Sequence, residues 1–144
     1  MVATDKGWIA VDLDGTLADY TNGWQGADII GDPVPEMFDR VRRWMDEGRE
    51  IRIFTARVWP ITEVVDRLSP EHELLFVYGD NERTRAAIVA AKAILGWTLK
   101  HFGVAFPITC VKDLRMVELY DDRCVQVVAN TGRLVGGSSR GVTP

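Results

Sequence analysis

Cysteine and histidine are both scarce in this chain of 144 residues, which contains two of each. The two cysteines, Cys110 and Cys124, do not form a CxxC pair and have no histidine at zinc-finger spacing. This pattern argues against a framework of several disulfides and against a structural zinc site. Both cysteines lie in apolar stretches, so we expect buried, reduced thiols, with a disulfide between neighbouring strands as the alternative.

The sequence also lacks an excess of positive charge and any long apolar run. Its net charge of −4 argues against general, non-specific nucleic-acid binding, although a local basic patch near a site is compatible with it. No apolar run approaches the roughly 18 residues of a membrane helix, and the N-terminus has no apolar signal-peptide core. We therefore expect a cytoplasmic protein with no membrane partner.

The length suits a single domain, which we place at residues 1–136, followed by a flexible tail at 137–144. Apolar runs predict strands at residues 7–11 and 50–55, and further short apolar runs occur at 106–111, 116–122 and 123–128. Helical spacing predicts helices over residues 35–47 and 82–102, each ended by a glycine. Residues 59–68 and 73–79 are harder to assign, and we expect a short helix and a third strand there.

Strands that alternate with helices predict an α/β fold with a mostly parallel sheet covered on both faces. The carboxyl ends of parallel strands meet at one edge, where ligands bind in such folds. Four polar groups follow the predicted strands: Asp12, Thr55, Lys112 and the pair Asp121–Asp122. We therefore expect these groups to gather at one edge of the sheet.

The residue types in this group suit phosphoryl transfer. Asp12 and Asp121 tolerate each other if a cation lies between them, and carboxylate oxygens are ligands for Mg²⁺. Asp12 would attack phosphorus and form an aspartyl-phosphate, while Asp14 would first donate and then accept a proton. Thr55 and Lys112 would stabilise charge on the phosphoryl oxygens.

The motifs that carry this group resemble those of the haloacid dehalogenase (HAD) superfamily. The segment DLDGTL resembles its first motif, DxDGT, and IFTAR resembles its second. Lys112, in VKD, matches the third motif, and ELYDDR matches the fourth. The order and spacing fit across residues 7–122.

The resemblance implies a Rossmann-like, three-layer core and a role for each matching residue. Asp12 would be the nucleophile and a metal ligand, and Asp14 the general acid/base, which binds metal through its backbone carbonyl. Asp121 would be a metal ligand, and Asp122 a direct or water-mediated one, unless Asp122 only orders Arg123 or backbone amides. The second aspartate of the first motif favours a phosphatase or phosphotransferase over a dehalogenase.

The sequence departs from many HAD enzymes because it has room for only a small cap or insertion. The gap between Asp14 and Pro35 is about the size of a loop, and residues 58–82 are too few for a full cap domain. An open site suits a macromolecular substrate, such as a nucleic-acid end or phosphoprotein. It also suits a small phosphorylated molecule enclosed by a second subunit of a homo-oligomer.

Several residues near the motifs have two interpretations. Arg57 and Arg123 would steer phosphate or form surface ion pairs. Tyr20, Trp24 and Trp59 would stack on a base or sugar, or pack their loops onto the body.

These observations predict a Mg²⁺-dependent phosphatase that hydrolyses a phosphate monoester through an aspartyl-phosphate at Asp12. The alternatives are a non-catalytic HAD-fold module that binds metal or phosphate, and a phosphotransferase.

Overall fold

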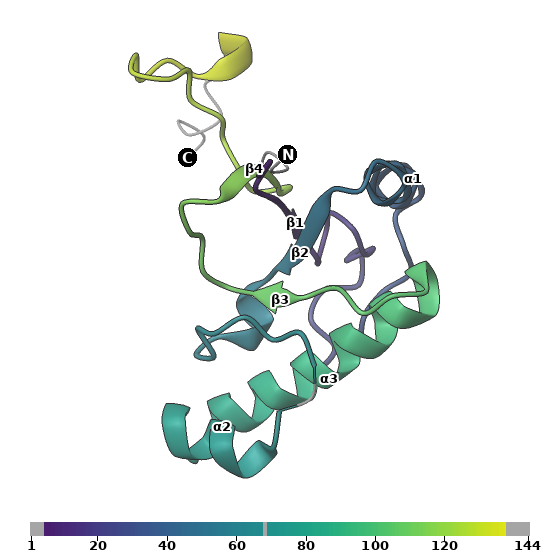
Figure 1. The fold of residues 1–144 in the computed structure, drawn as a ribbon, viewed down its shortest axis with the longest axis vertical. Helices are drawn as coiled ribbons and strands as arrows, with labels where there is room; N and C mark the ends of the chain where they lie inside the picture. Colours follow the sequence, from purple (N-terminus) through teal and green to yellow (C-terminus); the bar gives the residue numbers. More distant parts are fainter. Residues whose placement is uncertain (1–4, 68, 138–144) are drawn as a thin grey trace.

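The computed structural model describes residues 5–67 and 69–137, and it contains a four-stranded sheet in the order β3-β2-β1-β4. The strands are β1 (Trp8–Asp12), β2 (Glu50–Phe54), β3 (Ile108–Thr109) and β4 (Met116–Tyr120). All three strand pairings are parallel (Figure 1). The predicted α/β architecture with a parallel sheet is therefore confirmed, and all four strands end at the same edge.

The helices α1 (Pro35–Asp46) and α3 (Glu82–Phe102) follow the predicted bounds closely. Pro35 occupies the first turn of α1, where its missing N–H leaves no bond unmade. The Asn81 side chain caps α3 by accepting from the backbone N–H of Thr84. Gly103 ends α3 in the left-handed conformation, which glycine adopts without strain.

One face of the sheet packs against both of these helices. The ring of Phe38 in α1 stacks on that of Phe102 in α3, with 4.8 Å between the ring centroids. Trp44 of α1 lies against Tyr120 of β4. The core of the molecule therefore lies between this face and the two helices, and it includes Ile9 and other buried residues of β1 and β2.

The opposite face is covered by the connection from β3 to β4, residues 110–115. Trp8 is fully buried on this face, and its indole N–H donates to Asp113 at 2.8 Å. Arg52 of β2 lies 4.4 Å from the Trp8 ring and forms an ion pair with Asp113. Within the described residues, this irregular segment takes the place that a second helical layer has in the expected three-layer core.

Two predicted elements are wrong. Residues 73–79 do not form a strand, because α2 (Glu71–Tyr78) is a helix that packs on α3. A short apolar run is compatible with a strand or a helix. Here Pro70 is followed by the acidic residues Glu71 and Glu73, which favour the start of a helix. Phe76 is 90% exposed, so the run does not mark a buried strand.

The short helix predicted at 59–68 is also absent from the part of that stretch that the structure describes. A single 3-10 turn, η1 (Ala56–Val58), precedes it. The backbone of Val65 instead exchanges two hydrogen bonds with Ile108, so this chain segment pairs with the edge strand β3. Leu68 lies outside the described residues.

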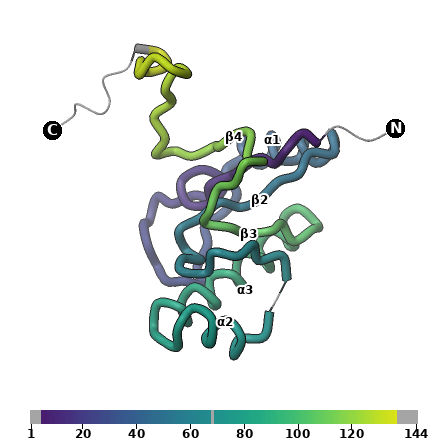
Figure 2. Tube along the Cα trace, turned by 60° about the vertical axis from the view of Figure 1, so that its left-hand side comes forward, coloured from purple at the N-terminus to yellow at the C-terminus, as the bar shows by residue number. Residues whose placement is uncertain are grey.

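The chain after β4 leaves the body of the molecule, as both views show (Figures 1 and 2). The apolar run at 123–128 forms no strand, and one bridge, between Val127 and Leu134, closes a turn ahead of η2 (Val135–Gly137). Cys124 is exposed and Cys110 is half-buried, and both are free thiols, which corrects the expectation that both are buried.

The predicted flexible tail lies almost entirely outside the described residues, since these end at position 137. Across 5–67 and 69–137, no helix has both the length and the apolar character that crossing a membrane requires.

Candidate functional site

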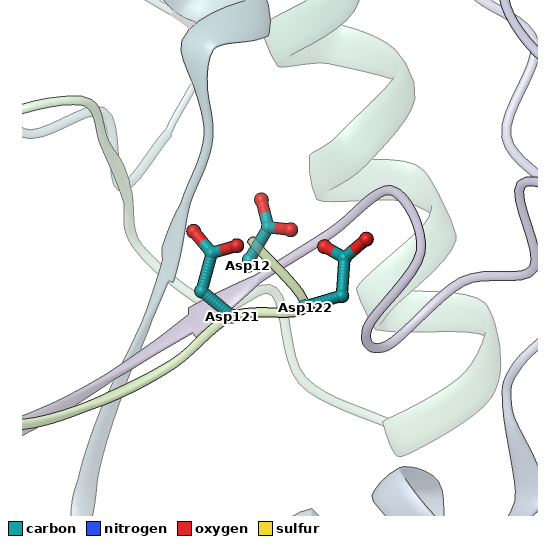
Figure 3. A group of neighbouring side chains, drawn as sticks. All are labelled: Asp12, Asp121 and Asp122. Atoms are coloured by element: carbon teal, nitrogen blue, oxygen red, sulfur yellow. The ribbon is translucent and has the colours of Figure 1, made fainter. Parts of the chain in front are cut away.

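Three aspartates meet at the carboxyl ends of the neighbouring strands β1 and β4. Asp12 is the last residue of β1, and Asp121 and Asp122 directly follow β4. One carboxylate oxygen from each aspartate lies within 4.8 Å of one carboxylate oxygen from each of the other two. The three side chains point to the same side (Figure 3). The structure thus brings together three of the four predicted metal ligands.

The turn after β1 holds this cluster together. The hydroxyl of Thr16 accepts a hydrogen bond from the backbone N–H of Asp122 at 2.9 Å. The same oxygen lies 3.3 Å from a carboxylate oxygen of Asp12 and 3.3 Å from one of Asp122, so its single proton is shared between them. Thr16 therefore ties the end of β1 to the end of β4.

Gly15 allows the two segments to approach this closely. Its φ of +85° is a conformation that side chains other than glycine rarely adopt. A Cβ atom at this position would also lie 2.6 Å from a carboxylate oxygen of Asp122. Two physical reasons therefore favour glycine at this position of the DxDGT pattern: the backbone conformation and the close approach of Asp122.

The cluster holds more negative charge than its surroundings balance. The pKa of Asp12 is raised from 3.8 to about 7, first by burial and then by the neighbouring carboxylates of Asp121 and Asp122. Burial and the same three aspartates also raise the pKa of the nearby Cys124 thiol. A divalent cation with oxygen ligands would offset this repulsion, so the donor set fits Mg²⁺.

Asp14 takes part in a different interaction. Both of its carboxylate oxygens accept hydrogen bonds from the Arg57 guanidinium, at 2.7 and 2.8 Å. The Arg57 side chain is buried, so the expectation of a surface ion pair is wrong. Two carbonyl groups, those of Gly26 and Ala27, accept further bonds from the same guanidinium.

Thr55 directly follows β2 and is buried. Its hydroxyl oxygen accepts the backbone N–H of Arg57 at 3.1 Å, which caps η1. Among the described residues no acceptor is found for the hydroxyl proton of Thr55, which leaves that proton available for a ligand.

A cavity of about 880 Å³ opens beside these residues. Asp12, Asp14 and Thr55 line it, and so does Asp122. Asp14, which lies beyond the end of β1 and forms an isolated bridge with Ala18, thus shares this cavity with Asp12. The other lining residues are Tyr20, Trp24, Ala56, Arg57, Asn81, Glu82, Arg83, Ala86 and Arg123.

Lys112 is not among the residues that line this cavity, and its side chain is exposed. It lies in the connection that crosses the opposite face of the sheet from β3 to β4. Its role as the phosphate-binding cation stays a prediction from the sequence.

Sequence reasoning missed the structural roles of Thr16 and Arg83 and undervalued Arg57. The TAR triplet directly after β2 was a usable signal for Arg57, because it places an arginine two residues from a predicted phosphate ligand. Arg83 lies at the start of α3, about 25 residues further on, and no local pattern links it to the site.

Comparison of the chain with family models, with curated proteins and with solved structures gives no match.

Proposed function

We propose that this chain is a Mg²⁺-dependent phosphohydrolase with a HAD-type core, which cleaves a phosphate monoester through an aspartyl-phosphate at Asp12. The observation that carries the proposal is the convergence of Asp12, Asp121 and Asp122 beside a cavity that Asp14 and Thr55 also line. These residues occur in the order of the HAD motifs, and the parallel sheet is compatible with that core.

The metal would be held by the carboxylates of Asp12, Asp121 and Asp122. When bound, Mg²⁺ supplies positive charge that stabilises the phosphoryl oxygens and offsets the repulsion within the cluster. The Thr55 hydroxyl donates its free proton to a phosphoryl oxygen, and the arginines of the cavity add further positive charge.

The reaction consists of two displacements at phosphorus. In the first, a carboxylate oxygen of Asp12 bonds to phosphorus, the bond to the ester oxygen breaks, and Asp14 gives a proton to that leaving oxygen. In the second, the oxygen of a water molecule attacks the same phosphorus and Asp14 takes its proton. The bond to Asp12 then breaks and inorganic phosphate leaves.

Arg57 sets a condition on this cycle. An aspartate that accepts two bonds from an arginine is bonded as the ionised form, which suits the second displacement. The first displacement needs a proton on Asp14. We therefore expect the substrate's phosphate to draw Arg57 away from Asp14 as it binds.

The same ion pair favours a second candidate, a module that binds metal or phosphate without hydrolysis. If Asp14 never leaves Arg57, it has no part in proton transfer and serves only to hold the loop at 26–27 in place. Tight binding of phosphate esters without turnover would support this candidate.

The test compares the wild-type protein with Asp12→Asn on p-nitrophenyl phosphate, with Mg²⁺ and with a chelator. We expect loss of activity on chelation, recovery with Mg²⁺, and a fall of about 10³-fold or more in Asp12→Asn, because the nucleophile is removed. Circular dichroism confirms that the variant folds. Near-normal turnover by Asp12→Asn would refute the assignment of the nucleophile.

A further inference from the structure

The cavity beside Asp12 is much larger than a phosphate group needs. Its volume of about 880 Å³ lies near the upper end of the range, roughly 300–1,000 Å³, of pockets that enclose whole organic ligands. If phosphate binds at Asp12, most of the cavity is left for the group that carries the phosphate. The chemical character of the remaining lining residues therefore indicates which kind of leaving group the cavity would accept.

Two aromatic side chains line this remaining space, both from the loop between β1 and α1. Trp24 is 58% exposed and Tyr20 is 38% exposed. An exposed tryptophan at a cavity wall offers a flat apolar surface on which another ring can stack.

The Trp24 ring is held in place before any ligand binds. The guanidinium of Arg57 lies 4.7 Å from the centroid of the Trp24 ring, within the range of a cation–π contact. The same guanidinium bonds to the carbonyls of Gly26 and Ala27, in the loop that carries Trp24. In the ligand-free protein Arg57 thereby links the ring to its own loop and to Asp14, so the aromatic surface is already formed beside the catalytic end of the cavity before substrate binds.

Two further arginines reach the cavity wall from other elements. Arg83 and Arg123 both line the cavity, and Arg83 is fixed by a bond to the carbonyl of Ala56 at 2.9 Å. Arg57, Arg83 and Arg123 face four acidic residues in the same lining, namely Asp12, Asp14, Glu82 and Asp122. The cavity therefore offers a few arginines that can contact a phosphate and no extended basic surface, which suits one or two phosphates and not a long nucleic-acid tract.

We propose that the substrate is a nucleoside monophosphate group, either free or at the end of a DNA or RNA strand. Its phosphate lies at Asp12 and its base stacks on Trp24. This inference rests on the proposed function and names its substrate class. A base presents the flat ring that stacks best on an exposed tryptophan, whereas a phosphate ester without a ring would leave Trp24 without a partner.

The test measures kcat and KM for AMP, for a short 5′-phosphorylated oligonucleotide and for the ringless ester glycerol phosphate. Phosphotyrosine is a fourth substrate, since it has a ring but no nucleoside. We expect both nucleotide substrates to exceed glycerol phosphate in kcat/KM, and the ratio of AMP to oligonucleotide identifies which source of the nucleotide is preferred. Equal values for AMP and glycerol phosphate, or a preference for phosphotyrosine over both nucleotides, would overturn the inference.

The variant Trp24→Leu tests the stacking contact. It should lower kcat/KM for AMP about tenfold to a hundredfold more than for glycerol phosphate, mainly through KM, because stacking stabilises the bound base. Phe76→Leu is the control, since Phe76 is an exposed aromatic residue of α2 that does not line the cavity. Equal losses on both substrates in Trp24→Leu would count against a ring site.

A binding measurement separates this inference from the proposed function. In the Asp12→Asn background, calorimetry should detect AMP binding that Trp24→Leu weakens about tenfold or more and Phe76→Leu does not. AMP binding of this kind without hydrolysis of any ester supports the nucleotide site and refutes the phosphohydrolase. Hydrolysis of esters without a preference for nucleotides, and without AMP binding, refutes the nucleotide site alone.

Discussion

Replacing Asp12 by asparagine removes one negative charge from the cluster of three aspartates, and we expect it to stabilise the metal-free protein while abolishing hydrolysis. Burial and the two neighbouring carboxylates raise the pKa of Asp12 from 3.8 to about 7. The ionised form is therefore less favourable in the folded state than in the unfolded chain. Asparagine has nearly the same shape and carries no charge.

The size of the effect follows from the pKa. A rise from 3.8 to about 7 corresponds to about 4 kcal/mol at roughly 1.4 kcal/mol per unit. Because Asp12 is only partly buried and water screens its charge, we expect about half of this, or about 2 kcal/mol. For a domain of this size the stabilisation appears as a rise of roughly 5–10 °C in Tm.

The sign of the pH dependence is fixed by the raised pKa. Below pH 3.8 Asp12 is protonated in both states, so wild type and Asp12→Asn differ little. As the pH rises from 3.8 towards 7, the unfolded chain loses the proton first and wild type loses stability relative to the variant. The advantage of Asp12→Asn is therefore largest above pH 7.

The assay is thermal unfolding in the presence of a chelator at pH 5 and at pH 8, repeated at pH 8 with saturating Mg²⁺. Mg²⁺ should raise the Tm of wild type and have a smaller effect on Asp12→Asn, which lacks one ligand charge. The control is Asp66→Asn, an exposed aspartate, which should change stability by less than about 0.5 kcal/mol. A lower Tm for Asp12→Asn than for wild type at pH 8, or no Mg²⁺ effect on either protein, would refute this reasoning.

Four further substitutions test other contacts. Gly15→Ala should lower the free energy of unfolding by about 1–3 kcal/mol, because its Cβ would lie 2.6 Å from an Asp122 oxygen at a φ of +85°; an unchanged Tm would contradict this. Arg57→Met should cost about 3 kcal/mol in urea unfolding, since it leaves Asp14 without its buried cation; a loss below about 0.5 kcal/mol would argue against the ion pair. Trp8→Phe removes the hydrogen bond to Asp113 and should lower the free energy of unfolding in urea by about 1 kcal/mol; an unchanged free energy would contradict this. Lys112→Met should lower kcat/KM for p-nitrophenyl phosphate by less than about threefold, because Lys112 is exposed and outside the cavity wall; a loss of about a hundredfold would restore the role predicted from the sequence.

The position of the aspartate cluster could be predicted because it depends on chain order alone. Asp12 ends one apolar run and Asp121 follows another, and parallel strands must end at the same edge of their sheet. The helix α3 was predictable for a similar reason, since its cap Asn81 and its final Gly103 are local signals.

The errors arose where the local pattern fits more than one structure. The run at 73–79 is apolar enough for a strand, but α2 exposes Phe76 and buries only Leu74. The run at 123–128 resembles a strand as well, yet among the residues that the structure describes it forms only one bridge, between Val127 and Leu134. Strand formation requires a partner, and the sequence of one segment does not say whether a partner is available.

The sequence by itself determined the alternation of strands and helices and the order in which acidic groups follow the strands, because periodicity and end signals act between near neighbours. Only the tertiary structure decided that Arg57 is buried against Asp14, that Trp24 and Arg83 from separate segments share a cavity, and that residues 110–115 cover the second face of the sheet. These contacts join residues that are far apart in the chain, so they depend on how the elements pack and not on the preferences of any one segment.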